Sequence, residues 1–221
     1  SFWEAMRKNG ANFAMPSRLV AMNQLSNHDH SRFMTRTSHK AGRIDTLGAK
    51  AADEGNNPAV FREAVVMLMT WPGAPTLYYG DEAGVCGFTD PDNRRTYPWG
   101  HEDKELIQFH KDIIKIRKEN DELKKGSTKF LYKDYNVISY GRFTRDSKSI
   151  VIVNNNDSER EVNVKVVDIG ISSDTTLKQL IFTYDTKYTL SPDIYPIIGG
   201  KLRIFMPKYS SIILKANSFE Q

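Results

Sequence analysis

The spacing of apolar residues changes near residue 125, and this change constrains the fold of the 221-residue chain more than any other feature. Before that point, short apolar runs alternate with segments of helical spacing. After it, apolar and polar residues alternate over short runs separated by turn residues. The first pattern is typical of βα units on a parallel sheet and the second of an antiparallel β structure. We therefore expect two domains, 1–125 and 126–221.

Two strand-and-helix units fit the first domain. Leu19–Leu25 and Ala74–Tyr79 are short, mostly apolar runs that predict buried strands. Asn57 followed by Pro58 predicts the start of the helix between them, because asparagine caps a helix and proline is tolerated at its first position. Apolar residues at helical spacing within 106–116 predict a second helix.

A long polar loop follows each predicted strand, over residues 26–56 and 81–102. Loops of this length in a compact domain are usually functional. In a β/α barrel, the loops after the strands lie at the face that carries the active site. The functional residues are therefore expected in these two loops.

The second domain is expected to be an antiparallel β-sandwich, because its short alternating runs are separated by turns rich in Asp, Asn, Ser and Gly. The predicted strands are Thr128–Tyr132, Val137–Phe143, Ile150–Asn154, Val162–Val167, Leu177–Phe182, Lys201–Met206 and Ser211–Lys215.

Composition excludes several classes of protein. Hydrophobic residues make up 39% and charged residues 26%, as in soluble globular proteins. The formal charge of +4 comes from interspersed basic and acidic residues, so no nucleic-acid partner is predicted. No apolar run approaches the roughly 20 residues of a membrane span, so no membrane association is predicted. Cys86 is the single cysteine, which favours a reducing compartment and a cytoplasmic location.

Asn27-His28-Asp29-His30 follows the first predicted strand and carries the first group of candidate residues. A carboxylate between two imidazoles suits a metal site, to which His39 could add a ligand. It also suits an acid–base or charge-stabilising group at the mouth of a barrel. A polar loop with a helix-capping Asp is the structural alternative, and the residues alone leave all three open.

The second group of candidates is Tyr78–Glu82 together with Asp90–Arg95. Two aromatic side chains at the end of a strand can stack on sugar rings or pack in a core. The Asp and Arg side chains can bind hydroxyl groups through charged hydrogen bonds, or can pair with each other across a rigid loop.

Together these segments resemble the α-amylase family, glycoside hydrolase family 13. Ser26–Asp29 followed by Arg32-Phe33 resembles the family's fourth conserved region, at the end of barrel strand seven. Pro72–Glu82 is similar to strand eight with its lead-in. Gly87–Arg95 is similar to the neopullulanase, cyclomaltodextrinase and α-glycosidase branch. The remaining strands resemble the family's C-terminal β-domain.

The resemblance implies the last two βα units of a TIM (β/α)8 barrel followed by an antiparallel β-sandwich. It implies that Asp29 is the catalytic carboxylate that stabilises the transition state and that His28 binds the sugar in the same subsite. It implies that Asp90 and Arg94 hold a glucose unit farther toward the non-reducing end. The whole enzyme is then expected to act on α-glucosidic linkages of maltodextrin-like substrates.

The nucleophilic Asp and the acid/base Glu of the family belong to strands four and five, and no matching motif is found in this sequence. We expect the true N-terminus to be missing, the N-terminal remainder of the enzyme to be a partner, and the isolated chain to be inactive. A non-catalytic carbohydrate-binding or structural fragment is the alternative. No cofactor is expected to be required, and calcium and a homodimer are left open.

A remnant of only two barrel units would leave apolar side chains uncovered. The residues concerned are Val20, Met22, Leu77 and Tyr78. We therefore expect the isolated chain to be poorly soluble, to associate with itself, or to require the rest of the barrel.

Overall fold

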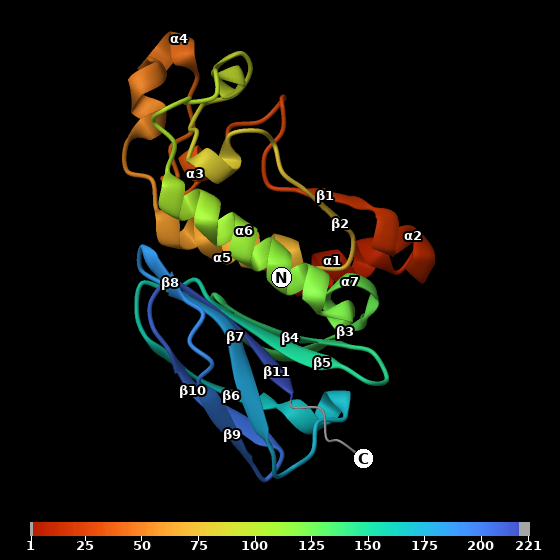
Figure 1. The fold of residues 1–221 in the computed structure, drawn as a ribbon. Coiled ribbons are helices and arrows are strands. Elements are labelled where there is room, and N and C mark those ends of the chain that lie inside the picture. The colour runs from red at the N-terminus through yellow and green to blue at the C-terminus, as the bar shows by residue number, and fades with distance from the viewer. Residues whose placement is uncertain (1, 217–221) are drawn as a thin grey trace.

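The structure is a computed structural model that describes residues 2–216. Helices with one short parallel strand pair form the first part of the chain, and antiparallel strands form the second (Figure 1). The helices and strands of the first part are α1 (Phe2–Gly10), α2 (Met15–Val20), β1 (Met22–Gln24), α3 (Phe33–Arg36), α4 (Ile44–Leu47), η1 (Ala49–Asp53), α5 (Pro58–Thr70), β2 (Ala74–Thr76), η2 (Asp81–Ala83), η3 (Asp92–Arg94), α6 (Lys104–Glu119) and α7 (Asp121–Lys125).

β1 and β2 pair in parallel, with Asn23 opposite Pro75, and α5 connects them. α6 follows β2, so the predicted order of two strand-and-helix units is present. Both strands are shorter than the runs 19–25 and 74–79 predicted: Val20 ends α2, and Tyr78 lies beyond β2. Among the described residues, β1 and β2 pair only with each other. Both strands therefore end where their three paired residues end.

The start of α5 is as predicted. The Asn57 side-chain oxygen accepts hydrogen bonds from the backbone N–H groups of Ala59 and Val60, at 3.0 and 3.3 Å. Pro58 occupies the first turn, where its missing N–H costs nothing.

The second part is an antiparallel β structure that folds over on itself. Its strands are β3 (Ser127–Asp134), β4 (Val137–Phe143), β5 (Lys148–Asn154), β6 (Arg160–Lys165), β7 (Thr176–Tyr184), β8 (Lys187–Thr189), β9 (Ile194–Ile198), β10 (Lys201–Met206) and β11 (Ser210–Ala216). The hydrogen-bonded order is β3-β4-β5-β11-β7-β9-β10-β6, with β8 on β7, and the last strand of this path packs against the first.

This arrangement confirms the predicted β-domain and adds two strands. β8 has three residues and β9 contains Pro196, so neither shows a clear alternation in the sequence. The predicted strand Val162–Val167 is too long, because Val166 begins a 3-10 helix, η4 (Val166–Ile169).

Alternate residues of β5 face two separate cores. Val151 and Val153 pack with the helices, in the cluster that contains Phe61 and Phe109. Ile150 and Ile152 pack between the layers of the β-domain. The sheet is buried on both faces, and Figure 1 shows it between α5 and α6 on one side and β6, β9 and β10 on the other.

Polar side chains join the helices to one another and to the sheet. Arg117 of α6 donates to the carbonyl oxygens of Met69 and Gly73, both at 2.7 Å. Thr70 and Tyr140 share a hydrogen bond of 2.6 Å between their hydroxyl groups. α7 ends at Lys125 and β3 begins two residues later, and the boundary proposed near residue 125 stays a prediction.

Among residues 2–216, the helices are too short or too polar to cross a lipid bilayer.

Candidate functional site

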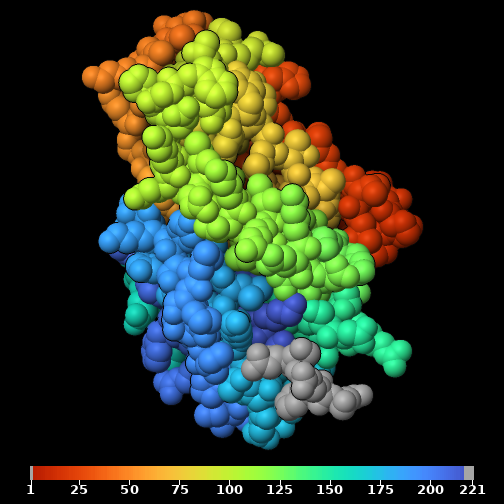
Figure 2. All heavy atoms as spheres, viewed as in Figure 1, coloured from red at the N-terminus to blue at the C-terminus, as the bar shows by residue number. Residues whose placement is uncertain are grey.

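The residues that follow β1 and β2 emerge at the same edge, because the two strands are parallel. His28 and Asp29 lie after β1, and Tyr78–Asp81 lie after β2. Figures 1 and 2 show these loops at the end of the molecule away from the β-domain. The predicted site residues are therefore gathered at one end of the fold.

The His28-Asp29 turn is held by the side chain of Asn27. Its oxygen accepts hydrogen bonds from the backbone N–H groups of Asp29 and His30, at 2.9 and 3.0 Å. The side chains of His28 and Asp29 are 60% and 67% exposed, and His28 Nε2 lies 3.5 Å from Asp29 Oδ1. Both side chains are open to a ligand.

Arg32 is fully buried at the centre of the site. Its Nε donates to the carbonyl oxygen of Asn93 at 2.9 Å, and its Nη1 lies 3.0 Å from Asp81 Oδ1 and also donates to the carbonyl oxygen of Tyr79. The guanidinium lies 4.2 Å from the centre of the Tyr78 ring. Arg32 therefore joins the segments after β1 and β2 to the Asp90–Arg95 loop.

Asn93 connects that loop back to the His28-Asp29 turn. Its Nδ2 donates to the carbonyl oxygens of Asn27, at 3.2 Å, and of His30, at 2.9 Å. Asn93 is fully buried, so the donor side of both bonds is shielded from water.

Asp90 and Arg94 form an exposed pair on the outside of the same loop. Arg94 Nε donates to Asp90 Oδ1, and both side chains are about half exposed. The hydrogen bond to Asp90 raises the pKa of Arg94, and the charge of Asp29 adds a smaller contribution in the same direction. The candidate sugar-binding pair therefore lies within electrostatic reach of Asp29.

Asp92 and Arg95 pair with each other across the loop, which is the structural alternative to binding hydroxyl groups. Arg95 Nε donates to Asp92 Oδ1 at 2.9 Å, and Arg95 Nη1 donates to Asp53 at 2.8 Å. Asp92 also accepts the backbone N–H of Phe88 at 2.7 Å. These bonds shape the loop and tie it to η1, leaving Asp90 and Arg94 free to face solvent.

The two tyrosines divide between packing and exposure. Tyr78 lies against Arg32, and burial is the main cause that raises the pKa of its hydroxyl. Tyr79 is 43% exposed, and its hydroxyl donates to the carbonyl oxygen of Arg95 at 2.9 Å. The pair therefore supports the loop and still presents part of one ring to solvent.

Sequence reasoning placed Asp81 and Asn93 in the second candidate group and Arg32 in the family motif, but it assigned none of the three a role in holding the site together. Asp81 is buried beside Arg32; burial raises the pKa of its carboxyl group, and hydrogen bonds from Ser26 and Arg32 oppose that shift. Arg32 and Asp81 are 49 positions apart, so no local pattern indicates their pairing.

No three His, Cys, Asp or Glu side chains within residues 2–216 converge closely enough to hold a metal ion. This statement covers His28, Asp29, His30 and His39, the residues of the metal-site alternative.

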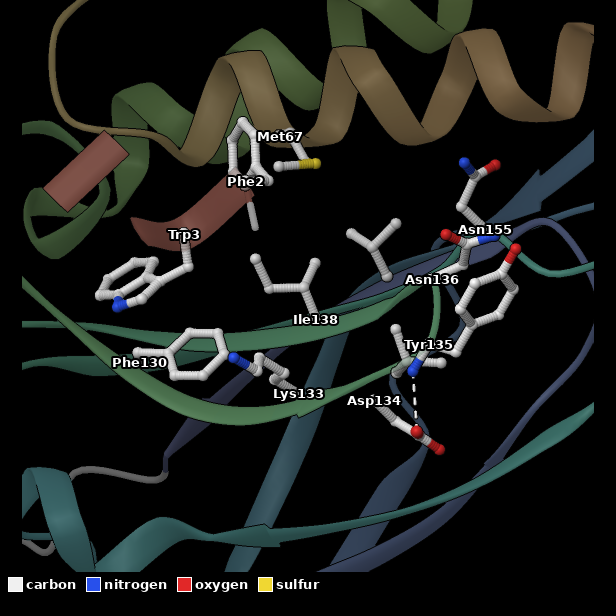
Figure 3. A pocket seen from close by; sticks show the side chains of 12 residues that line it. Phe2, Trp3, Met67, Phe130, Lys133, Asp134, Tyr135, Asn136, Ile138 and Asn155 are labelled. Atoms are coloured by element: carbon white, nitrogen blue, oxygen red, sulfur yellow. Dashed lines mark hydrogen bonds between the residues drawn. The ribbon is translucent and has the colours of Figure 1, made fainter. Parts of the chain in front are cut away.

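A separate hollow of about 750 Å³ lies between α1 and the hairpin of β3 and β4 (Figure 3). Phe2, Trp3 and Phe130 line one part of it, and Tyr135 and Asn136 another. None of the candidate site residues lines this hollow.

The chain is similar to amylopullulanases and cyclomaltodextrinases, although no protein-family model matches it. It is 36% identical over 223 residues to an amylopullulanase of Thermoanaerobacter thermohydrosulfuricus, covering 91% of this chain and 14% of that protein. It is 37% identical over 145 residues to a cyclomaltodextrinase of Thermoanaerobacter pseudethanolicus, covering 65% of this chain and 22% of that protein.

The fold matches solved α-amylase structures. The crystal structure of an α-amylase from Geobacillus thermoleovorans, complexed with acarbose, superposes with a TM-score of 0.76 at 24% identity, covering 98% of this chain and 43% of that one. The sequence and the fold place the chain in a family of glycoside hydrolases. The chain belongs to the α-amylase family, glycoside hydrolase family 13, in the branch of neopullulanases and cyclomaltodextrinases, and matches the family's C-terminal part.

Proposed function

We propose that the chain is part of a retaining glycoside hydrolase that acts on α-glucosidic linkages of maltodextrin-like substrates. In this proposal β1, α5, β2 and α6 are the last two units of a (β/α)8 barrel, and the β-domain packs on its helices. One observation carries the proposal: His28 and Asp29 are exposed at the same edge as Asp90 and Arg94.

Asp29 is proposed to stabilise the transition state. Cleavage of a glycosidic bond develops positive charge at the anomeric carbon and on the ring oxygen. An exposed carboxylate that binds hydroxyl groups more strongly as this charge develops lowers the barrier. The backbone N–H of Asp29 donates to the side-chain oxygen of Asn27, and this bond fixes the turn that carries the Asp29 carboxylate. His28, adjacent to it, is proposed to hydrogen-bond the same sugar.

Asp90 and Arg94 are proposed to bind a neighbouring glucose unit. A paired carboxylate and guanidinium offer acceptors and donors to adjacent hydroxyl groups. Their exposure leaves these atoms available to a ligand, in contrast to Asp92 and Arg95, which are used within the loop.

A retaining mechanism also needs a nucleophile and an acid/base carboxyl group about 5 Å apart. Asp81 is buried against Arg32 and Asp92 is held by Arg95, so neither is presented as this pair requires. We propose that both groups come from the N-terminal remainder of the enzyme and that the isolated chain is inactive. We also propose that the enzyme is cytoplasmic and that its reaction requires no cofactor.

The test is maltotriose hydrolysis by the full-length protein before and after Asp29→Asn. We expect a loss of at least about 100-fold in kcat, because the neutral amide stabilises developing positive charge poorly. Asp146→Asn, at an exposed turn between β4 and β5, is the matched control and should leave kcat unchanged.

Two results would contradict the proposal. Hydrolysis unaffected by Asp29→Asn would remove Asp29 from the reaction. Maltotriose binding without any hydrolysis by the full-length protein would indicate a carbohydrate-binding module instead.

A further inference from the structure

Two groups of substrate-facing residues are carried by segments more than 60 residues apart in the sequence. His28 and Asp29 lie on the turn after β1, and Asp90 and Arg94 lie on the loop after β2. A substrate that contacts both groups needs them at a fixed separation, because a displacement of about 1 Å in a catalytic group can lower the rate 100-fold.

The side-chain amide of Asn93 bridges the two segments directly. It donates to the carbonyl oxygens of Asn27 and His30, the residues that flank His28 and Asp29. Arg94, the next residue in the chain, faces solvent and pairs with Asp90. One residue therefore joins the backbone of the catalytic turn to the backbone of the sugar-binding pair.

Arg32 holds the backbone of Asn93. Its guanidinium donates to the carbonyl oxygen of Asn93 while the ion pair with Asp81 and the Tyr78 ring fix its own position. All the side-chain atoms of Arg32 and Asn93 are shielded from solvent, which removes water as a competitor for these bonds. Neither side chain is exposed to a ligand.

We propose that Asn93, held by Arg32, is a positioning residue that sets the placement of Asp29 relative to the Asp90–Arg94 pair. This inference rests on the proposed function of the site. Removing the Asn93 amide frees both carbonyl oxygens of the turn, so Asp29 loses its placement while Arg94 stays attached to its own loop.

Hydrogen exchange tests the mechanical part without relying on activity. In the full-length protein, Asn93→Ala should speed amide exchange in the segment 25–33, since the turn loses two of the hydrogen bonds that hold it to the Asp90–Arg95 loop. Asn93→Asp keeps the side-chain volume but can place an oxygen against the two carbonyl oxygens, and it should speed exchange at least as much.

Asn154 provides a matched control. It is also fully buried, and its Nδ2 donates to the carbonyl oxygens of Met206 and Pro207 at 3.0 and 2.7 Å, in the β-domain. Asn154→Ala and Asn154→Asp remove a comparable buried amide in the β-domain, which also donates to the carbonyl oxygen of Ser158 at 3.0 Å. They should speed exchange in the β-domain and leave the segment 25–33 unchanged.

Kinetics with maltotriose test the positioning role. Asn93→Ala should lower kcat by about 10- to 100-fold with a smaller change in KM, since the displaced group acts mainly in the transition state. Arg32→Lys keeps a positive charge beside Asp81, but an ammonium group cannot replace the guanidinium that donates to Asn93. Like Asn93→Ala, it should speed exchange in the segment 25–33 and lower kcat. The Asn154 variants should keep the kcat of the folded enzyme.

The outcomes separate this inference from the proposed function. Unchanged exchange in 25–33 for Asn93→Asp would overturn the inference whatever the activity. Faster exchange with an unchanged kcat would also overturn it, because the turn would then move without consequence for catalysis. A wild-type enzyme without hydrolytic activity would refute the proposed function, and the exchange result would still decide whether Asn93 holds the turn.

Discussion

The buried guanidinium of Arg142 in β4 donates a hydrogen bond to the carbonyl oxygen of Thr70, the last residue of α5. It also donates to the carbonyl oxygen of Gly126 at 2.9 Å, and burial lowers its pKa to about 10. A cation at the C-terminal end of a helix compensates carbonyl groups that have no partner within the helix. Arg142 thereby connects the helical part of the chain to the β-domain.

Replacing Arg142 with Met should destabilise the protein by about 2–4 kcal/mol. The apolar stem is kept, but two buried carbonyl oxygens lose a charged donor. Thermal and urea unfolding of the full-length protein would measure the change. The control is Arg203→Met, which breaks an exposed pair with Glu161 and should cost less than about 1 kcal/mol. Equal effects of the two substitutions would show that the buried connection adds nothing.

Glu63 should make stability fall as pH rises between about 4.5 and about 9. It is buried in α5, and burial raises its pKa from 4.5 to about 9. Between these values the folded state holds a proton that the unfolded state has released, so the folded state is progressively disfavoured as pH increases. The slope is at most about 1.4 kcal/mol per pH unit.

Glu63→Gln should remove this slope and stabilise the protein at pH 8 relative to wild type. Urea unfolding at pH 6, 7 and 8 would measure it. Glu119→Gln, an exposed position at the end of α6, is the control and should leave the slope in place. A wild-type slope in the Glu63→Gln variant would mean that Glu63 is ionised in the folded protein.

Arg94 should affect binding more than chemistry. Arg94→Ala removes a guanidinium that is proposed to hold a glucose unit away from the scissile bond, so KM for maltotriose should rise about 10-fold while kcat changes less than about 3-fold. Arg203→Ala is matched to it, because Arg203 is also an exposed arginine paired with a carboxylate. A fall in kcat without a change in KM would contradict a binding role.

The isolated 221-residue chain should associate with itself through the exposed apolar side chains near β1. Val20 and Met22 are 75% and 63% exposed. Replacing both with Ser should reduce association in sedimentation experiments. Ile198, 76% exposed on β9, is the control position, and Ile198→Ser should have no such effect. A monodisperse, cooperatively melting wild-type chain would contradict the prediction.

Local patterns were sufficient where a structural feature depends on neighbouring residues. Asn57-Pro58 predicts the start of α5, because a cap needs only the backbone of the next three residues. The alternation in 137–143 predicts β4 with its observed bounds. The same reasoning overextended 19–25, because the length of a strand depends on how many residues its partner offers.

The sequence by itself determined the division into a helical part and a β-rich part and the family resemblance, and it supplied the candidate site residues. Only the tertiary structure decided that β11 lies between β5 and β7 and that Arg32, Asp81 and Asn93 form one buried support. The physical reason is the separation of the interacting residues along the sequence. Helix caps and the alternation of apolar and polar residues involve positions only a few residues apart. The Arg32 contacts join residues 49 and 61 positions apart, and only the folded chain brings them together.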